Sequence, residues 1–404
     1  MDPGANTTDL RARARARAAR AGPLHASASG SVPLVAYVVG ARPNFVKMAP
    51  VIEAMRKRGH TRQLVVHTGQ HYDPRLSDDI LADLGFPDPD VSLDVGSGTH
   101  ADQTGKVLVG FEDVLVERRP DMVVVAGDVN STLACALAAA KLGVPVAHLE
   151  AGLRSDDWSM PEEINRVLTD RMADVLLTHS PEAEPNLLRE GIDPARIHYV
   201  GNTMIDSLRK LEGRARRRAV WTDLGLNPHE YVLVTLHRPS NVDDPVQLNA
   251  IVEALTTLGA SAPVVFPVHP RTLERLRPGS GLERLERANV RCIGPAGYLD
   301  FLSLEGAAGA IVTDSGGVQE EASALGVPCY TFRSNTERPV TITHGTNVLL
   351  GDDPALIAGV RPSSLPPTPS AIPLWDGHAA ERSADALSAA LAGQQAGEER
   401  LALA

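Results

Sequence analysis

The sequence has few cysteines, a deficit of positive charge and no long apolar run, and each shortage excludes a class of protein. Three cysteines lie far apart in 404 residues, which leaves no metal-type spacing and fits a reducing compartment. Lys and Arg number 39 against 50 Asp and Glu, and the formal charge of −11 disfavours non-specific nucleic-acid binding. Because no apolar run reaches about 18 residues, we predict no membrane span. We therefore expect a cytoplasmic protein without nucleic-acid or membrane partners.

The first 31 residues differ in composition from the rest of the chain. Arginine alternates with alanine from Arg11 to Arg17, and a stretch rich in Gly, Ser and Ala follows. No apolar segment of a secretory signal comes next. This composition predicts a disordered tail, and a mitochondrial-type presequence is the alternative.

From Val32 onward, short apolar runs alternate with stretches of helical period, which is typical of repeated βα units and a parallel sheet. The runs are apolar at odd and even positions alike, as strands covered on both faces should be. We predict an α/β protein of two Rossmann-like, doubly wound domains that face a central cleft. The predicted strands are Leu34–Val39, Gln63–His67, Met122–Ala126, Val146–Leu149, Val175–Thr178, Ile197–Tyr199, Tyr231–Leu236, Val264–Pro267, Val290–Ile293, Ala310–Thr313, Pro328–Phe332 and Val348–Leu350.

A basic helical stretch, Arg209–Arg218, separates the two halves and shows no clear apolar face. We therefore divide the chain just before it. The predicted parts are a tail over residues 1–31, a first domain over 32–204, a second domain over 205–375 and a terminal helix in 376–404 that returns to the first domain.

Two cations follow the first predicted strand. Doubly wound sheets bind ligands outside the carboxyl ends of their strands. Arg42 and Lys47 flank a strand-to-helix junction after Gly40, where a helix N-terminus would help them to meet an anion. The segment is not a phosphate loop, because the second glycine and the Lys-Ser/Thr pair are missing. Two surface cations are the alternative interpretation.

Three carboxylates follow neighbouring strands or begin the next helix: Asp128, Glu150 and Glu162. Asp128 could be a helix cap, and Glu162 could simply suit a helix dipole. Glu150 directly follows an apolar strand and has no such role. Carboxylates that share one cleft can be driven to different pKa values and divide acid and base duties.

In the second half, His237 and His269 follow predicted strands, although a structural histidine is the alternative for each. The most specific segment is Thr313–Glu321, in which a strand ends, a Ser-Gly-Gly turn follows and a helix begins. Its backbone N–H groups could approach a diphosphate, whereas a plain tight turn is the alternative. Glu321 would repel phosphate, so a ribose diol suits it better, and Arg338 could hold phosphate as a charged fork.

Taken together, these segments resemble the UDP-N-acetylglucosamine 2-epimerase family of the non-hydrolysing type, over about residues 34 to 350. The resemblance implies a fold of the glycosyltransferase-B type, a UDP-sugar as substrate and a homodimer. The segments that carry it are Gly40–Lys47, Thr68–His71, Gly127–Asp128, His148–Arg154, Pro161–Arg166, Val200–Asp206, Thr235–Arg238, Pro267–His269, Thr313–Glu321 and Thr336–Pro339.

The resemblance also implies roles for single residues. Asp128, Glu150 and Glu162 would be the acid/base carboxylates, with His237 close to the diphosphate or the sugar. Glu321 would hold ribose, and Phe301 would sit near uracil. The implied substrate-binding residues are Arg42, Lys47, Arg154, Arg166, His269, Phe301, Ser315, Gly316, Gly317, Glu321 and Arg338.

The chain departs from the family pattern at three places. Asn44 stands where a glutamate is common. Gln70–Asp73 and His237–Asn241 differ from the segments that form a second substrate site in members activated by their own substrate. These departures leave the three carboxylates untouched.

The chemistry at C2 of an N-acetylhexosamine favours loss of UDP as the first step. The C2 hydrogen is not next to a carbonyl carbon, and the G-x-G-x-x-G fingerprint of a nicotinamide site is missing. When UDP leaves, C1 gains oxocarbenium character and a carboxylate can remove the C2 proton to give a 2-acetamidoglucal. This scheme needs no cofactor and no metal. The alternatives are a hydrolysing epimerase, a glycosyltransferase and a non-catalytic sugar-nucleotide binder.

Overall fold

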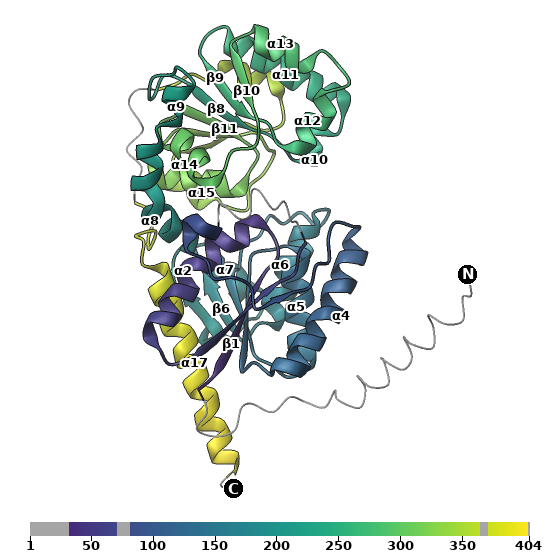
Figure 1. Ribbon diagram of the computed structural model, residues 1–404, viewed down its shortest axis with the longest axis vertical. Helices are drawn as coiled ribbons and strands as arrows, with labels where there is room; N and C mark the ends of the chain where they lie inside the picture. Colours follow the sequence, from purple (N-terminus) through teal and green to yellow (C-terminus); the bar gives the residue numbers. More distant parts are fainter. Residues whose placement is uncertain (1–31, 71–80, 364–370, 403–404) are drawn as a thin grey trace, which may run out of the picture.

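The computed structural model describes residues 32–70, 81–363 and 371–402, and it shows two parallel sheets with helices around them (Figure 1). The predicted tail and the segment from His71 to Asp73 lie outside the described residues, as do the side chains of Arg42 and of residues 395–402. The α/β fold predicted from the sequence is confirmed.

The first sheet belongs to the first domain and has the strand order β3-β2-β1-β4-β5-β6-β7 in the described part of the chain. The chain moves outward from β1 in one direction and from β4 in the other, so these neighbours form the switch point at which such sheets bind ligands. The elements are β1 (Leu34–Val39), α2 (Arg42–Arg58), β2 (Arg62–His67), β3 (Val91–Ser92), α4 (His100–Arg118), β4 (Met122–Ala126), α5 (Asn130–Lys141), β5 (Val146–Ala151), α6 (Pro161–Met172), β6 (Val175–Thr178), α7 (Ala183–Arg189), η1 (Pro194–Arg196) and β7 (Ile197–Tyr199).

The second sheet repeats this plan in the second domain, with the order β10-β9-β8-β11-β12-β13 and its switch point between β8 and β11. The elements are α9 (Val220–Asp223), β8 (Val232–Thr235), α10 (Pro239–Val242), α11 (Pro245–Gly259), β9 (Val264–Pro267), α12 (Pro270–Leu276), α13 (Gly281–Arg287), β10 (Val290–Ile293), α14 (Tyr298–Gly306), β11 (Ala310–Thr313), α15 (Gly316–Leu325), β12 (Cys329–Thr331), α16 (Val340–Thr343), β13 (Asn347–Leu349) and η2 (Pro354–Gly359).

The central strands are apolar at most positions because both faces of each sheet are covered. In β1, Val35 and Tyr37 join a core cluster with α2, whereas Ala36 and Val38 join another with α4 and α5. Side chains alternate across a strand, so the two sets face opposite ways. Every strand predicted from an apolar run is present, with ends shifted by at most a residue or two. The two-residue strand β3 was not predicted.

Helix α8 (Thr203–Arg218) connects the domains and has an apolar face, contrary to the prediction. Leu208, Leu211 and Ala215 are buried in a cluster that contains residues of α2 and α14. Their spacing of three and four residues places them on one side of the helix. The arginines between them hide this stripe in the sequence.

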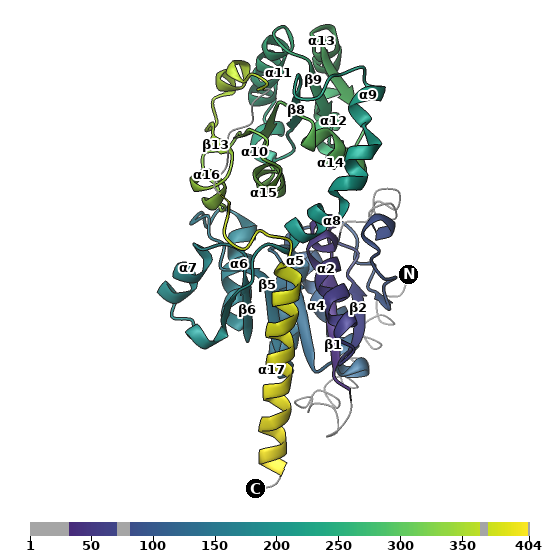
Figure 2. The same cartoon turned by 90° about the vertical axis from the view of Figure 1, so that its left-hand side faces the viewer.

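The last helix, α17 (Ala379–Ala402), lies along the first domain beside α2 (Figures 1 and 2). Its first turn is fixed by Asp206 of α8, whose carboxylate accepts hydrogen bonds from the Ala379 and Ala380 backbone N–H groups at 3.2 and 2.7 Å. Such a cap satisfies donors that have no partner inside the helix. Within the described residues, no helix combines the length and the apolar character that crossing a bilayer requires.

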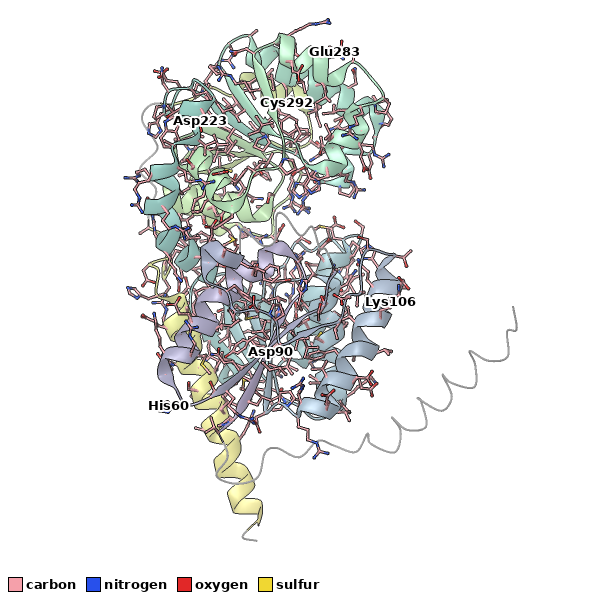
Figure 3. All side chains as sticks on the ribbon, in the orientation of Figure 1. His60, Asp90, Lys106, Asp223, Glu283 and Cys292 are labelled. Atoms are coloured by element: carbon pink, nitrogen blue, oxygen red, sulfur yellow. The ribbon has the colours of Figure 1, made fainter. Side chains whose placement is uncertain are left out.

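The three cysteines are free and belong to separate elements. Cys135 of α5 and Cys329 of β12 are fully buried, which confirms them as core residues, and burial raises the pKa of both thiols. Cys292 lies on β10 in the second domain and is half-buried (Figure 3). They therefore act as small apolar side chains.

Candidate active site

Glu150 occupies an irregular position at the end of β5. The pairing of β5 with β6 shifts between Leu149 and Ala151, and Glu150 has a φ of 71°. Positive φ is uncommon for a residue with a side chain, and a bulge changes the direction in which a strand side chain points. Backbone strain of this kind is concentrated at functional sites. The residue is nonetheless 7 % exposed, so its carboxylate needs partners inside the protein.

Two cations supply those partners, one from each domain. Lys47 of α2 forms an ion pair with Oε2 of Glu150, and Nη2 of Arg338 lies 3.0 Å from Oε1. Arg338 follows β12 in the second sheet, so this ion pair joins the domains. We call the group around it the interdomain site.

The guanidinium of Arg338 is enclosed by carboxylates. Besides Glu150, it contacts Glu337 through Nη1 and Glu320 through Nε, the latter at 2.8 Å. Burial alone would raise the pKa values of Glu320 and Glu337, but Arg338 lowers both together with other partners, among them His179 for Glu320 and Arg333 for Glu337. Both carboxylates are therefore ionised, and Arg338 is held from three sides.

A glycine lets Arg338 approach the start of α15. A Cβ added at Gly316 would lie 2.7 Å from Cζ of Arg338 and 3.0 Å from Oε1 of Glu337. Real Cβ atoms do not come that close to other atoms, so a side chain at Gly316 would displace the guanidinium. The glycine of the predicted Ser-Gly-Gly turn thus accommodates an arginine in this structure.

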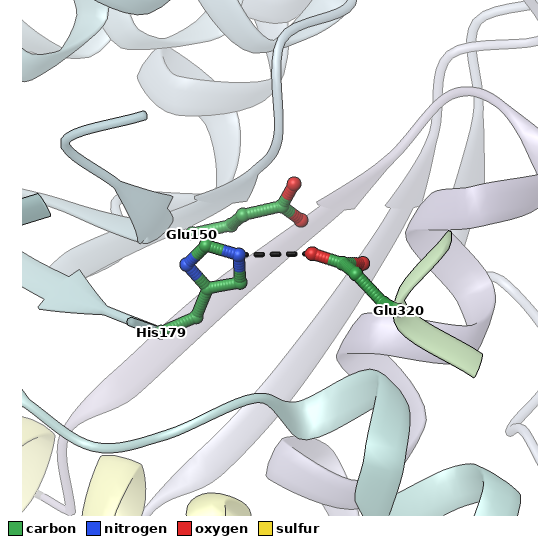
Figure 4. A group of neighbouring side chains, drawn as sticks. All are labelled: Glu150, His179 and Glu320. Atoms are coloured by element: carbon green, nitrogen blue, oxygen red, sulfur yellow. Dashed lines mark hydrogen bonds and ion pairs between the residues drawn. The ribbon is translucent and has the colours of Figure 1, made fainter. Parts of the chain in front are cut away.

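His179, which follows β6, reaches into the same site. Its Nε2 lies 2.9 Å from Oε1 of Glu320, as Figure 4 shows. Glu150, His179 and Glu320 each offer a possible metal-ligand atom within 4.8 Å of the others. Lys47 and Arg338 already compensate the two carboxylates, so a divalent ion would have to displace these cations.

Asp128 is positioned by helix α6. Its Oδ2 accepts a hydrogen bond from Nη1 of Arg166 at 2.5 Å, and its backbone carbonyl accepts one from Asn165 at 2.8 Å. Glu163 fixes the other side of Arg166 at 2.7 Å. The carboxylate of Asp128 is 26 % exposed and contributes to the field at Arg338. Asp128 and Glu150 thus both act electrostatically on the same guanidinium, that of Arg338.

Glu162 is placed differently. It lies in the first turn of α6 and is exposed, and its side chain has neither a hydrogen bond nor an ion pair with any described residue. Its neighbour Glu163 is buried and accepts from the Ser155 and Asp156 backbone N–H groups. The structure therefore brings Asp128 and Glu150 into one charged network and leaves Glu162 outside it.

His237 is oriented by Asp314, which directly follows β11. Asp314 is fully buried and accepts from the His237 and Arg238 backbone N–H groups and from the Asn241 side chain, each at 2.9 Å. Its other oxygen lies 2.9 Å from Nδ1 of His237. Burial would raise the pKa of Asp314, but these partners lower it. The ring of His269 lies 5.2 Å from that of His237, and its Nδ1 caps α12.

The predicted nucleotide residues line up along α14 and α15. Ser315 is the N-cap of α15, and the two glycines after it form the first turn, where backbone N–H groups are unpaired within the helix. Glu321, one turn later, accepts a hydrogen bond from Tyr298 at 2.7 Å. Burial raises the pKa of the neighbouring Glu305 well above its ordinary value, and Glu321 adds to this. Phe301 packs half-buried against the core of the second domain.

Arg154 is engaged inside the first domain. It forms ion pairs with Asp170 and Glu190, each at 2.7 Å, and the buried Asp170 also contacts His148. The same carboxylate accepts from the Gly152 backbone N–H at 3.0 Å. Arg154 and Asp170 therefore fix the turn that directly follows Glu150.

Asn44, at the first departure from the family pattern, fastens the start of α2. Its side-chain oxygen accepts from the Gly40 and Ala41 backbone N–H groups at 3.2 and 3.0 Å, and its amide donates to the Ala126 carbonyl at 2.9 Å. Arg42 begins the same helix. Asn44 thus ties the β1–α2 junction to the end of β4.

Four residues of the site were not singled out from the sequence: His179, Asp314, Glu320 and Glu337. His179 and Asp314 directly follow strands, so the argument that selected His237 applies equally to them. Glu320 and Glu337 carry no such signal, because each stands beside a residue that was chosen and only the fold shows which side chain turns inward.

Comparisons with known proteins agree with the resemblance. The family described as UDP-N-acetylglucosamine 2-epimerase matches residues 53–388. The chain is 45 % identical to the UDP-N-acetylglucosamine 2-epimerase of Methanocaldococcus jannaschii, over 78 % of this chain and 88 % of the relative. It is 46 % identical to a UDP-2,3-diacetamido-2,3-dideoxy-D-glucuronate 2-epimerase of Pseudomonas aeruginosa, over 78 % and 87 %.

Solved structures support the same relationship. The crystal structure of M. jannaschii UDP-GlcNAc 2-epimerase in complex with UDP-GlcNAc and UDP has a TM-score of 0.81 and 41 % identity, covering 88 % of this chain and 99 % of that one. The UDP-GlcNAc 2-epimerase of Neisseria meningitidis bound to UDP-GlcNAc has a TM-score of 0.74 and 30 % identity, covering 81 % and 90 %.

Proposed function

Because this chain belongs to the UDP-N-acetylglucosamine 2-epimerase family, we propose that it interconverts UDP-N-acetylglucosamine and UDP-N-acetylmannosamine by inverting C2. The observation that carries the proposal is the position of Glu150. A carboxylate on a strained strand end lies between cations of both domains, Lys47 and Arg338, and a second carboxylate, Asp128, acts electrostatically on the same Arg338.

The reaction begins with elimination. The bond between C1 and the diphosphate oxygen breaks, and its electron pair leaves with UDP. A carboxylate takes the C2 proton, and the electrons of the C2–H bond form the C1–C2 double bond of a 2-acetamidoglucal. UDP then adds back to C1 while a proton reaches C2 from the opposite face. Two faces require two protonatable groups, for which we propose carboxylates of the set Asp128, Glu150 and Glu162.

The diphosphate has the charge to compete for the cations that hold Glu150. We propose that Arg338, Lys47 and Arg42 bind it, together with the Ser315–Gly317 turn. When these cations exchange Glu150 for phosphate, the Glu150 carboxylate becomes available for proton transfer. Binding of UDP and preparation of the base are then one event. Groups that stabilise the departing charge are each worth about 2.7–4 kcal/mol in comparable sites.

The remaining assignments follow the placement of the elements. We propose that residues 32–204 supply the acid/base carboxylates and that residues 205–375 bind UDP, with Glu321 on ribose and Phe301 near uracil. We propose that His237, which pairs with Asp314 at 2.9 Å, faces the diphosphate or the sugar. His269 and Arg166 support His237 and Asp128. We also propose that the protein is a cytoplasmic homodimer, which light scattering of the purified protein and fractionation of cells would test.

A second substrate has a specific observation in its favour. The P. aeruginosa relative, at 46 % identity, is named for a diacetamido-glucuronate UDP-sugar. The inversion at C2 is the same, but that sugar has an acetamido group at C3 and a carboxylate at C6. Both UDP-sugars should therefore be offered to the protein in parallel.

The decisive experiment is proton NMR of the protein with UDP-N-acetylglucosamine in deuterated water. We expect UDP-N-acetylmannosamine with deuterium at C2. Free N-acetylmannosamine and UDP would replace the proposal by a hydrolysing epimerase. Absence of exchange with this sugar, together with exchange in the diacetamido-glucuronate sugar, would reassign the substrate. Absence of exchange in both would contradict the proposed function.

A further inference from the structure

His179 is fixed at the interdomain site, although the proposed chemistry gives it no task. The residue directly follows β6 and is 2 % exposed. The Trp375 ring lies 6.2 Å from its ring, and the Trp375 indole N–H donates to its backbone carbonyl at 2.9 Å. The imidazole therefore has one defined place.

From that place, the imidazole crosses from the first domain to the second. Its Nε2 lies 2.9 Å from Oε1 of Glu320 on α15, and both residues are buried (Figure 4). The same Glu320 oxygen lies 2.8 Å from Nε of Arg338, whose Nη2 lies 3.0 Å from Glu150. The path His179–Glu320–Arg338–Glu150 thus starts and ends in the first domain and passes through the second.

The shape of a guanidinium explains why this path matters. It is a rigid plane with donors on fixed edges, so two anchored edges determine where the third points. Glu320 attracts the guanidinium of Arg338 as an ion pair, with 2.8 Å between Oε1 and Nε but no hydrogen bond from Nε, and Glu337 accepts a hydrogen bond from Nη1, which leaves Nη2 directed at Glu150. Glu337 is itself held at 2.7 Å by Arg333 of the second domain. Among the described residues, His179 is the side chain of the first domain that forms a hydrogen bond with Glu320.

We propose that His179 is a positioning residue that acts through Glu320 to orient Arg338 toward Glu150 and the diphosphate. The proposal rests on the proposed function only for the identity of the ligand. It makes the orientation of Arg338 depend on contact between the domains, because the donor and the arginine belong to different domains.

Three variants separate this role from simple packing. His179→Phe keeps the ring and removes the donor, whereas His179→Gln keeps an N–H group at the reach of Nε2. We expect His179→Phe to lower kcat/KM for UDP-N-acetylglucosamine about tenfold and to weaken UDP binding about fivefold, losses within the range expected for one hydrogen bond. His179→Gln should recover most of both losses. The matched control is His198→Phe on the half-buried strand β7, which should leave both values unchanged.

A double-mutant cycle with Glu320→Gln tests the route of the effect. If His179 acts through Glu320, then adding His179→Phe to Glu320→Gln should lower kcat/KM by less than about twofold, since coupled residues are not additive. Additive losses would overturn the proposal. So would equal losses in the Phe and Gln variants, which would indicate packing alone.

Calorimetry with UDP keeps this test separate from the test of the proposed function. If the wild-type protein binds UDP but epimerises no sugar, the proposed function fails, and the UDP affinities of the same variants still decide whether His179 positions Arg338. Unchanged UDP affinity and unchanged kcat/KM in His179→Phe would overturn the inference. Should that variant not fold, His179→Asn replaces it, because its shorter amide does not reach Glu320.

Discussion

The two sides of the interdomain site hold their carboxylates in different ways. On the second-domain side, Glu320 and Glu337 are buried, and cations lower their pKa values although burial opposes this. On the first-domain side, Asp128 is 26 % exposed, and Glu162, which lies outside the charged network, is exposed as well. The second side is therefore a fixed ionic frame, whereas the first side offers carboxylates that water and a ligand can reach.

Glu150 combines both conditions. It belongs to the first sheet, but it is buried and held by Lys47 and Arg338. When Lys47 and Arg338 exchange Glu150 for phosphate, the Glu150 carboxylate is released, whereas Glu320 and Glu337 keep their ionic partners. The comparison thus separates groups that bind the charged ligand from groups that transfer protons. Substitutions on the first-domain side should mainly lower kcat, and those on the second-domain side should mainly weaken UDP binding, by smaller factors.

The largest effect is expected at Glu150. Glu150→Gln keeps the size of the side chain and removes the base, so we expect kcat to fall about 10³-fold, within the usual range for general-base catalysis. Ser315→Ala on the second side removes one hydroxyl near the helix N-terminus, and we expect a loss of about tenfold. Initial rates by NMR compare the two.

Circular dichroism and thermal melting must first show that both proteins are folded. Comparable rates for folded Glu150→Gln and Ser315→Ala would remove the distinction between proton-transfer and charge-binding sides, and with it the assignment of Glu150.

A second prediction tests what burial does to the pKa of a carboxylate that no ionic frame surrounds. It provides the contrast to Glu320 and Glu337, whose pKa values are lowered by cations. Asp206, outside the site, is buried without such a frame, and burial raises its pKa from 3.8 to about 6. Between these values the folded protein keeps a proton that the unfolded chain has lost, so stability falls as pH rises through this window. Asp206→Asn should remove that fall, which amounts to no more than about 3 kcal/mol.

Urea unfolding at pH values from about 4 to about 7 measures the slope. The matched control is Asp244→Asn, since Asp244 also accepts a hydrogen bond at a helix start, from the first turn of α11 at 3.0 Å, but is exposed. An identical pH dependence of Asp206→Asn and the wild-type protein would show that burial does not control this carboxylate.

The fold was predictable because the apolar runs are complete strands covered on both faces. The prediction failed where the apolar pattern is short or interrupted. Strand β3 was missed because it has two residues and is partly exposed, and the apolar face of α8 was missed because arginines interrupt its stripe. The positions after the strands were predictable for the same reason, because parallel strands bring their carboxyl ends to one edge.

The partners of those residues could not be predicted. Glu162 and Glu163 are adjacent in sequence, and only the packing of α6 places Glu163 on Arg166 and leaves Glu162 exposed. The contact between Arg338 and Glu150 depends on how two domains meet, a property that no local pattern encodes. The bulge at Glu150 also depends on pairing with β6, not on the strand's own residues.

A last and smaller effect tests the ionic frame on the second-domain side. In Gly316→Ala, the new Cβ would lie 2.7 Å from Cζ of Arg338, so the guanidinium must move away from its carboxylates. We expect UDP affinity to fall about tenfold, as for the loss of a charged hydrogen bond. At Gly317 the nearest atom to a new Cβ is Sδ of Met204 at 3.7 Å, an ordinary contact. Gly317→Ala should therefore weaken UDP less than Gly316→Ala, although both residues open the same helix. Calorimetry with UDP decides between steric displacement of Arg338 and a general intolerance of side chains in the turn, because the second explanation predicts equal losses for the two variants.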